Sequence, residues 1–460
     1  MEEHPKPYYT GSEMKPDKST KVRRNQIQKV PSFLSDENKE SGDYDPKVVS
    51  LGPYHHGKEK LKFVQDFKPM ALDMFIEGSN QDKAFFLGEI LKEIEYAKSC
   101  YLEEFTCIYD DFYFAEMMLL DACFILNIIG PWEQTFKRSE TIEHLGTAVY
   151  TLSKRDLYLL ENQVPFRILM ILAKSRHPVD EKGFIKTAES SCFNILFDED
   201  IRSLKDNKQG TTDIPLHLLE IFRRAIVTGT GEVQQPRARP CDSFCEIFNK
   251  LGLCLEYWCC RQDQTSTRGR GGYVFHSVTD LKLKGIHFRP SEIASLNGVR
   301  FSPAEFCHSA TLKLPCWYVS PYTRSFFMNM IAYEFCPNVF TDKAVTAYVN
   351  FMKSLIVSQE DVKELREKKI LMNSLGSDEQ VVEVYKSLNT YGTEDESFFY
   401  KEKRNIEDHY NNKTRTWLSE LKNTYFNSPW SIIALVGSIY LLCSDIVQTY
   451  CAVHPSKGGS

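Results

Sequence analysis

Hydrophobic residues in this chain recur mostly at the spacing of α-helices. From residue 62 onward, apolar residues return every three to four positions in one stretch after another, as on the buried face of a helix. Residues 114–129 are apolar almost all round, which predicts a central, buried helix. The stretches that we expect to be helical are 62–74, 84–106, 114–129, 156–174, 185–197, 214–228, 241–259, 276–296, 323–335, 344–355, 358–367, 377–388, 394–426 and 430–453.

Two stretches interrupt the helical spacing. Residues 298–301 and 311–314 alternate apolar and polar side chains, and Pro315 separates them from Cys316–Val319, which is typical of short edge strands. In the stretch 156–174, Pro165 lacks an amide proton, which predicts a break near Val164 and a second helix beginning at Pro165. The predicted fold class is mainly α: a multi-helix globular body with a small antiparallel β-sheet near residues 298–320 and a C-terminal transmembrane helix.

The chain divides into three parts. Residues 1–26 are polar with scattered prolines and predict a disordered arm, in which Lys21, Arg23 and Arg24 form a small basic cluster that we expect to be solvated. Residues 27–426 form the main domain, with a flexible loop region at 229–275. Its first part, residues 27–60, is called the N-terminal strip, because its prolines keep it out of helix and its valines suggest a short strand or a strip on the core. Residues 427–454 predict a membrane anchor.

The predicted anchor is the most apolar part of the C-terminal region. Trp430 and Tyr450 are 20 positions apart, about 30 Å on a helix, and aromatic residues favour the two water–lipid interfaces. Asp445 opposes insertion by up to about 3 kcal/mol, less near the end of a span. The residues expected to contact lipid are Trp430, Ile432, Ile433, Leu435, Val436, Ile439, Tyr440, Leu441, Leu442 and Tyr450.

Basic residues around the anchor predict its orientation. Lys413, Arg415 and Lys422 precede it and only Lys457 follows, so the positive-inside rule places the main body in the cytoplasm, with the plasma membrane as the expected site. The alternative is a terminal helix packed on a soluble cytoplasmic core.

Composition excludes several classes. The formal net charge is −6, which gives no basic field for nucleic acid. The 14 cysteines include no metal-binding pattern, so buried reduced thiols are expected and neither a metal nor another cofactor is predicted. Aromatic residues make up 13% of the chain, enough for bulky core or interface anchors.

No motif specifies a reaction. Nucleotide-binding loops, GxSxG and HExxH are absent. If the protein were an enzyme, its site would form where the N-terminal strip meets the polar triplet after Leu160; its candidate residues are Tyr54, His55, His56, Glu161, Asn162 and Gln163. The competing interpretation is structural: buried polar side chains must find hydrogen-bond partners, and these would cap backbone groups.

Several segments resemble one known family. They are VPSFL, DPKVVSLGPYHHG, LLDACFILNII, DLYLLENQVPF, GVRF with LPCWYV, FMNMIAYE, YVNFMKSLI and EDVKEL, in that order. Together they resemble the plant "domain of unknown function 247" family, also called uncharacterised protein family 0481, over residues 27–452. The resemblance implies a mostly helical plant protein with a hydrophobic C-terminal anchor and no established enzymatic activity. Some relatives are implicated in grass self-incompatibility, and one lineage in reproductive development.

The expected function is therefore non-enzymatic. We expect a membrane-anchored protein of recognition or signalling, whose partners are membrane lipid, through the C-terminal helix, and an unknown protein. Neither nucleic acid nor a small-molecule substrate is expected. The polar loops 229–240 and 261–272 are the candidates for choosing the protein partner, since surface loops vary freely on a rigid body.

Overall fold

The computed structural model describes the main domain with several gaps. The described residues are 26–37, 41–129, 137–176, 180–196, 213–228, 276–303, 309–337, 339, 341–392, 398–412 and 429–453. Residues 1–25 of the predicted disordered arm, the Cys-rich helix at 241–259 and the loops 229–240 and 261–272 lie outside them. Within the described residues the fold is mainly helical with small sheets, as the sequence predicts.

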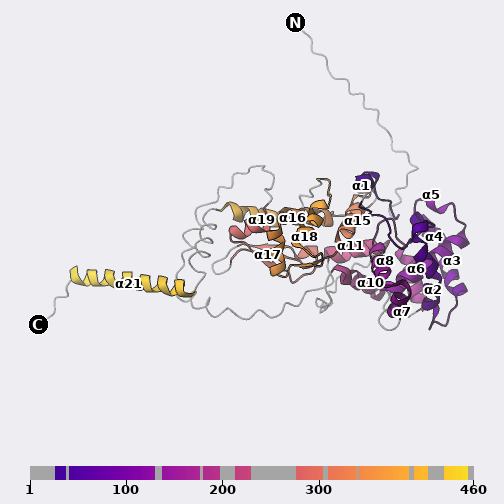
Figure 1. Ribbon diagram of the computed structural model, residues 1–460, viewed down its shortest axis with the longest axis horizontal. Coiled ribbons are helices and arrows are strands. Elements are labelled where there is room, and N and C mark those ends of the chain that lie inside the picture. Colours follow the sequence, from indigo (N-terminus) through magenta and orange to yellow (C-terminus); the bar gives the residue numbers. More distant parts are fainter. Residues whose placement is uncertain are drawn as a thin grey trace, which may run out of the picture.

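Helices of the first part of the chain surround one central helix (Figure 1). Helix α6 packs against α2, α3 and α9, and its side chains from Phe114 to Ile129 are almost all buried. This confirms the prediction of a central helix from its uniform apolar character. The helices of this part are α1 (Ser32–Glu37), α2 (Lys62–Ile76), α3 (Lys83–Leu91), α4 (Ile94–Ser99), α5 (Glu103–Thr106), α6 (Asp111–Ile129), α7 (Lys137–Leu145), α8 (Thr147–Asp156) and α9 (Phe166–Arg176).

Two of the predicted helices are divided. The stretch 84–106 folds as α3, α4 and α5, because the chain turns after α4 and the carbonyl of Cys100 accepts a hydrogen bond from the amide of Ile27 at 2.7 Å. In the stretch 156–174, α8 ends at Asp156 and α9 begins directly after Pro165, so the predicted start of a helix at Pro165 is confirmed. The predicted helix before it is wrong, because residues 157–165 form turns in which the side chains of Asn162 and Gln163 bond to backbone carbonyls.

Helix α10 still contacts α6 and α9 of the first part, and the chain that follows it extends to the other end of the body (Figure 1). There α15 and α16 pack together, and α18 contacts both. The helices described here are α10 (Glu181–Leu196), α11 (Leu218–Thr228), α14 (Val278–Leu283), α15 (Thr323–Phe335), α16 (Ala344–Leu355), α17 (Gln359–Glu367), α18 (Asp378–Ser387) and α19 (Tyr400–Asn411).

The β-structure differs from the predicted antiparallel sheet. One sheet has the order β1-β3-β2, in which β1 pairs parallel to β3 and β2 pairs antiparallel to it. A second sheet pairs β4 with β5 in parallel. The strands are β1 (His287–Pro290), β2 (Arg300–Ser302), β3 (Thr311–Leu314), β4 (Trp317–Val319) and β5 (Leu371–Asn373).

Two local causes explain the difference. The predicted helix at 276–296 is wrong beyond Leu283, because the chain turns at Gly285, whose φ of 78° suits glycine, and then enters β1. Pro315 separates β3 from β4, as predicted, but the two strands belong to different sheets. Strand β5 has three residues, too few for an alternating pattern to reveal it.

The N-terminal strip lies on the core without joining a sheet. Val49 and Leu51 are buried, and the amides of this stretch donate to side chains of the body and not to a neighbouring strand. Of the two forms that the sequence allowed, a strand or a strip, the structure has the strip. The prediction that its prolines exclude helix is wrong at α1, which begins directly after Pro31, where the proline carbonyl accepts from the amides of Leu34 and Ser35.

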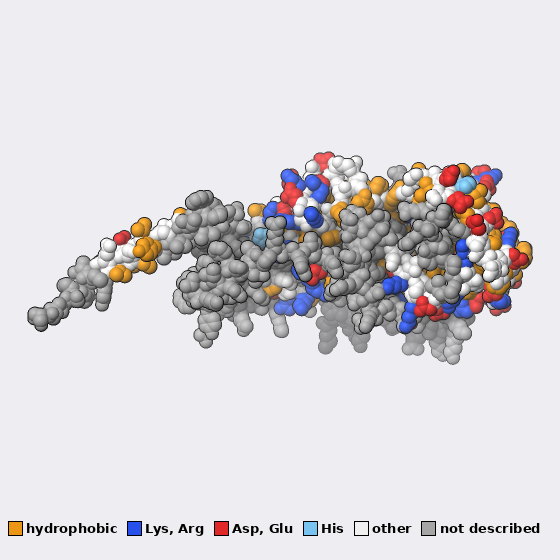
Figure 2. Space-filling view, turned by 90° about the horizontal axis from the view of Figure 1, so that it is seen from below, with side chains coloured by type: hydrophobic (Ala, Val, Ile, Leu, Met, Phe, Trp, Pro, Cys, Tyr) orange, Lys and Arg blue, Asp and Glu red, His pale blue; other side chains and the backbone are white. Residues whose placement is uncertain are grey.

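The chain ends in helix α21 (Pro429–Val453), which Figure 1 shows projecting from the body. Of the predicted anchor residues, Tyr440, Leu441 and Leu442 are exposed by 71%, 64% and 62%. Apolar side chains on this helix are visible in Figure 2. The side chains of the other predicted anchor residues lie outside the described part; they are Trp430, Ile432, Ile433, Leu435, Val436, Ile439 and Tyr450. By length and composition, one helix of the described residues could cross a membrane, and it is the mostly buried α6.

Candidate functional site

Buried polar side chains hold the N-terminal strip on the body; we call this region the polar seam. One carboxylate oxygen of Asp156 accepts hydrogen bonds from the amides of Lys47, Val48 and Val49, at 2.8–3.2 Å. Arg155, also buried, donates to the other oxygen at 2.7 Å and to backbone carbonyls of the strip. Burial raises the pKa of Asp156, although these hydrogen bonds and the arginine act in the opposite direction.

Asn162 and Gln163 belong to the same polar seam. The side-chain oxygen of Asn162 accepts from the amide of Leu51 at 2.7 Å, and its nitrogen donates to two backbone carbonyls. Gln163 donates to the carbonyls of Leu157 and Leu159 and accepts from the amide of Leu219. Both side chains are buried and their hydrogen-bonding capacity is largely used by the backbone, which agrees with the structural interpretation of the triplet.

Glu161 lies beside a histidine. One of its oxygens accepts from the amide of Val30 at 2.8 Å, and the other is 3.6 Å from Nε2 of His55. The opposite ring nitrogen of His55 is 2.6 Å from the ammonium of Lys58, so it serves as the acceptor. Burial, assisted by the charge of Lys58, lowers the pKa of His55 to about 3, and burial raises the pKa of Glu161. At neutral pH His55 is therefore uncharged.

Tyr54 and His56 point elsewhere. The hydroxyl of Tyr54 donates to the carbonyl of Ile27 at 2.6 Å, and burial raises its pKa. The Nε2 atom of His56 is 3.0 Å from the hydroxyl of Tyr113, near the surface. Of the six candidate residues, the structure thus brings His55 and Glu161 together, uses Tyr54, Asn162 and Gln163 to hold backbone, and places His56 apart.

A buried ion pair in the polar seam was missed by the sequence reasoning. The ammonium of Lys68 in α2 bonds to Asp121 in α6, and the exposed fractions of the two side chains are 0% and 1%. Asp121 also accepts from the amide of Gly52 at 2.7 Å. A signal was available for Asp121, which stands alone in the apolar run of α6, and buried charges are normally paired. Lys68 gave no such signal, because Gln65 and Asp66 precede it in α2.

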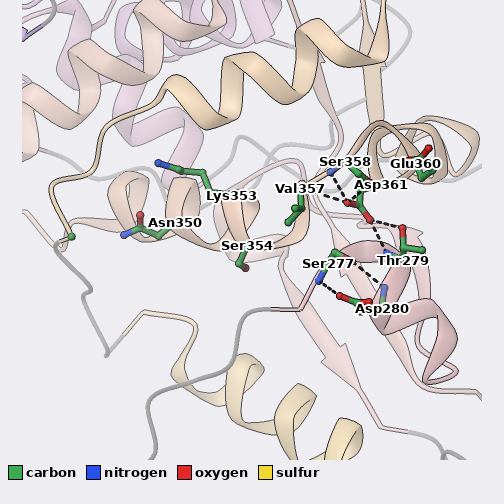
Figure 3. Close-up of a pocket in the computed structure, with 11 residues that line it drawn as sticks. Ser277, Thr279, Asp280, Asn350, Lys353, Ser354, Val357, Ser358, Glu360 and Asp361 are labelled. Atoms are coloured by element: carbon green, nitrogen blue, oxygen red, sulfur yellow. Dashed lines mark hydrogen bonds between the residues drawn. The ribbon is translucent and has the colours of Figure 1, made fainter.

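A cavity of about 670 Å³ lies at the other end of the body, between α14, α16 and α17 (Figure 3). The carboxylate of Asp361 accepts from the amide and hydroxyl of Thr279 at 2.8 and 2.6 Å and from the amide of Ser358 at 2.9 Å. Burial favours protonation of Asp361, but these hydrogen bonds outweigh it and lower its pKa. On the opposite wall, the ammonium of Lys353 donates to the carbonyl of Leu388 at 2.6 Å.

The cavity joins helix ends and carries no reactive constellation. The carboxylate of Asp361 caps α17 and binds Thr279 at the start of α14. These two residues are 82 positions apart in the chain, so sequence spacing could not reveal the cavity. The described residues also contain no group of three or more His, Cys, Asp or Glu side chains placed to hold a metal ion.

A helical body with small sheets, whose buried polar groups serve the fold, defines the structural class of this protein. The family model described as "plant protein of unknown function", DUF247, matches residues 27–444. The chain therefore belongs to the DUF247 family, which confirms the resemblance found in the sequence.

Two curated relatives from Arabidopsis thaliana are similar to it. The UPF0481 protein At3g47200 is 26% identical over 424 residues, covering 89% of this chain and 83% of the relative. The putative UPF0481 protein At3g02645 is 22% identical over 495 residues, covering 93% and 90%. No solved structure matches the chain significantly.

Proposed function

We propose that the protein is a non-enzymatic, membrane-tethered component of recognition or signalling, held at the membrane by α21 and acting through contacts with other proteins. The observation that carries the proposal is the exposure of apolar side chains on α21. Beyond Tyr440, Leu441 and Leu442, Ile446 and Val447 are exposed by 68% and 59%. Water disfavours such a helix surface, and a bilayer would bury it.

The polar seam favours binding over catalysis. The side chains of Asn162 and Gln163 bond to backbone groups. In the His55–Glu161 pair, one histidine nitrogen is engaged by Lys58, and the other has no hydrogen-bond partner among the described residues but is buried. A general base needs a nitrogen within hydrogen-bond reach of a substrate, and the burial of His55 keeps its free nitrogen away from the surface. The competing proposal, an enzyme that uses His55 and Glu161, predicts a turnover that is lost in the His55→Gln variant.

Membrane tethering would raise the local concentration of the body at the membrane surface and so favour weak contacts with partners there. The recognition roles expected from the family resemblance, including self-incompatibility, are compatible with such a component. The orientation with the body in the cytoplasm remains part of the same proposal.

Carbonate extraction of the full-length protein tests the tether. We expect wild-type protein to stay in the membrane pellet and the Leu441→Asp/Leu442→Asp variant to be extracted, because each buried carboxylate costs about 2.5–3.5 kcal/mol near the centre of a span. Ile108→Asp, a substitution at an equally exposed apolar residue of the body, is the matched control and should stay in the pellet. Wild-type protein in the soluble fraction would refute the tether.

A further inference from the structure

The turn between α5 and α6 presents an exposed aromatic surface. Tyr109 and Tyr113 stack with ring centroids 5.4 Å apart, and the ring of His56 meets both edge-on at 6.0 and 5.9 Å. Beside them Ile108 and Phe112 are exposed by 69% and 58%, and Tyr113 by 46%. These five residues are called the tyrosine surface. Exposed apolar groups at this density mark interaction sites.

Carboxylates border the tyrosine surface. Glu103 and Glu104 begin α5, Asp111 begins α6, and Asp110 directly precedes it; all four are exposed. Within residues 98–113 only Lys98 is basic, so four carboxylates against one ammonium leave a formal charge of −3. Aromatic faces ringed by acids suit a basic segment, whose cations can stack on the rings and pair with the carboxylates.

The same region already holds basic side chains in this way. The ammonium of Lys29 lies 4.8 Å from the ring centroid of Phe105, and that of Lys98 lies 5.7 Å from that of Phe114 while pairing with Asp111 at 2.7 Å. Contacts between cations and rings are thus a recurring feature of α5 and α6.

The described chain begins next to this surface. The side chain of Gln26 donates to the carbonyls of Ser99 and Tyr101, at the end of α4, and the amide of Ile27 donates to Cys100. Residues 21–24, which lie outside the described residues, read Lys-Val-Arg-Arg and carry three positive charges. Five extended residues span about 17 Å, so this tract can reach α5 and the start of α6 from Gln26.

We propose that residues 21–24 bind the tyrosine surface of their own chain and cover it until a protein with a basic segment displaces them. Three cations would meet the four exposed carboxylates that border the tyrosine surface. The short connection to Gln26 provides an effective concentration on the order of millimolar, so even a weak intrinsic affinity keeps the surface occupied. The proposal does not depend on the membrane tether.

Hydrogen exchange of the full-length protein at low ionic strength tests this directly. In the Lys21→Glu/Arg23→Glu/Arg24→Glu variant, amides of residues 107–113 should exchange about two- to tenfold faster than in wild type. This range corresponds to a wild-type surface that residues 21–24 cover for about one half to nine-tenths of the time. The matched control reverses three charges farther from Gln26, Lys6→Glu/Lys15→Glu/Lys18→Glu, and should leave exchange unchanged. Adding Glu103→Lys/Glu104→Lys to the first variant should restore protection.

Wild-type protein alone provides a second test. Raising the salt to about 0.5 M screens exposed charges and should speed exchange at residues 107–113 to the rate of the charge-reversed variant. Equal exchange in wild type and variant at low salt would overturn the proposal. The proposal would also be overturned if a labelled basic peptide, such as Lys-Val-Arg-Arg added in trans, bound wild type as tightly as the variant. Equal binding would mean that the tyrosine surface of wild type is already free for another protein.

Discussion

Replacing Asp121 by alanine should destabilise the body strongly. Asp121 neutralises the buried ammonium of Lys68, and its second oxygen holds the amide of Gly52 on the N-terminal strip. The substitution leaves Lys68 with the carbonyl of Ser50 and the side chain of Gln65 as its partners, with no counter-charge in a region that excludes water.

The structure sets the size of the effect. Removing one partner of a buried ion pair costs about 3–5 kcal/mol, and leaving a buried amide without a partner costs about 1–3 kcal/mol. Since Lys68 keeps two neutral partners, we expect the free energy of unfolding to fall by about 4 kcal/mol, a large part of the 5–15 kcal/mol typical of folded domains.

Urea unfolding followed by fluorescence measures this change. The matched control is Glu116→Ala in the same helix α6, because Glu116 pairs with Lys83 in an exposed position and its loss should cost less than about 1 kcal/mol. The double variant Lys68→Met/Asp121→Leu removes both charges and should be more stable than Asp121→Ala. If Asp121→Ala and Glu116→Ala unfolded at the same urea concentration, the reasoning would be wrong.

Three further predictions concern the polar seam and the buried histidines. Asn162→Leu leaves three backbone groups without a partner and should cost at least about 2 kcal/mol, seen as faster proteolytic cleavage within the N-terminal strip. Gly52→Ala should destabilise far more than Gly57→Ala in urea unfolding, because a Cβ at Gly52 would lie 2.6 Å from a backbone oxygen, whereas Gly57, also at positive φ, faces open space. Burial lowers the pKa of His217 from 6.5 to about 4 and that of His55 to about 3, so the unfolded chain binds more protons as pH falls below 6.5. Below pH 6.5 the free energy of unfolding should therefore decrease by up to about 1.4 kcal/mol per pH unit for each histidine. The His217→Phe variant should show a smaller slope of unfolding free energy against pH, and an unchanged slope would contradict this.

Helices with a strong apolar period could be predicted from the sequence, and short strands could not. Helix α16 follows the stripe from Ala344 to Leu355 closely, because burial of one helix face imposes a regular spacing. Strand β5 has no such period in its three residues; it exists because Trp317 donates its amide to the carbonyl of Ile370, a contact between distant segments. Pairing of that kind depends on the tertiary arrangement, which local spacing does not encode.

The candidate site shows the same division. The polar triplet after Leu160 could be recognised as unusual, because three polar residues interrupt apolar runs. The partners of that triplet could not be predicted, because Asn162 bonds to the amide of Leu51, 111 positions away. Whether such a triplet is catalytic or structural depends on which atoms use its lone pairs and protons, and these come from the folded backbone.

Helices α6 and α21 show why apolar length alone does not define a membrane span. They have 19 and 25 residues, lengths that suit the hydrocarbon core of a bilayer, and each carries an aspartate within its most apolar stretch, Asp121 in α6 and Asp445 in α21. In α6 the carboxylate is neutralised by Lys68 from a neighbouring helix, which a soluble core can provide and an isolated span cannot. In α21, Asp445 is exposed, and the surrounding Leu441, Leu442 and Ile446 are exposed with it. The surroundings of the aspartate therefore distinguish a buried core helix from a candidate membrane anchor. If α21 is the anchor, Asp445→Leu should strengthen retention of the protein in carbonate-washed membranes. A helix that packs on a soluble body would show no such gain.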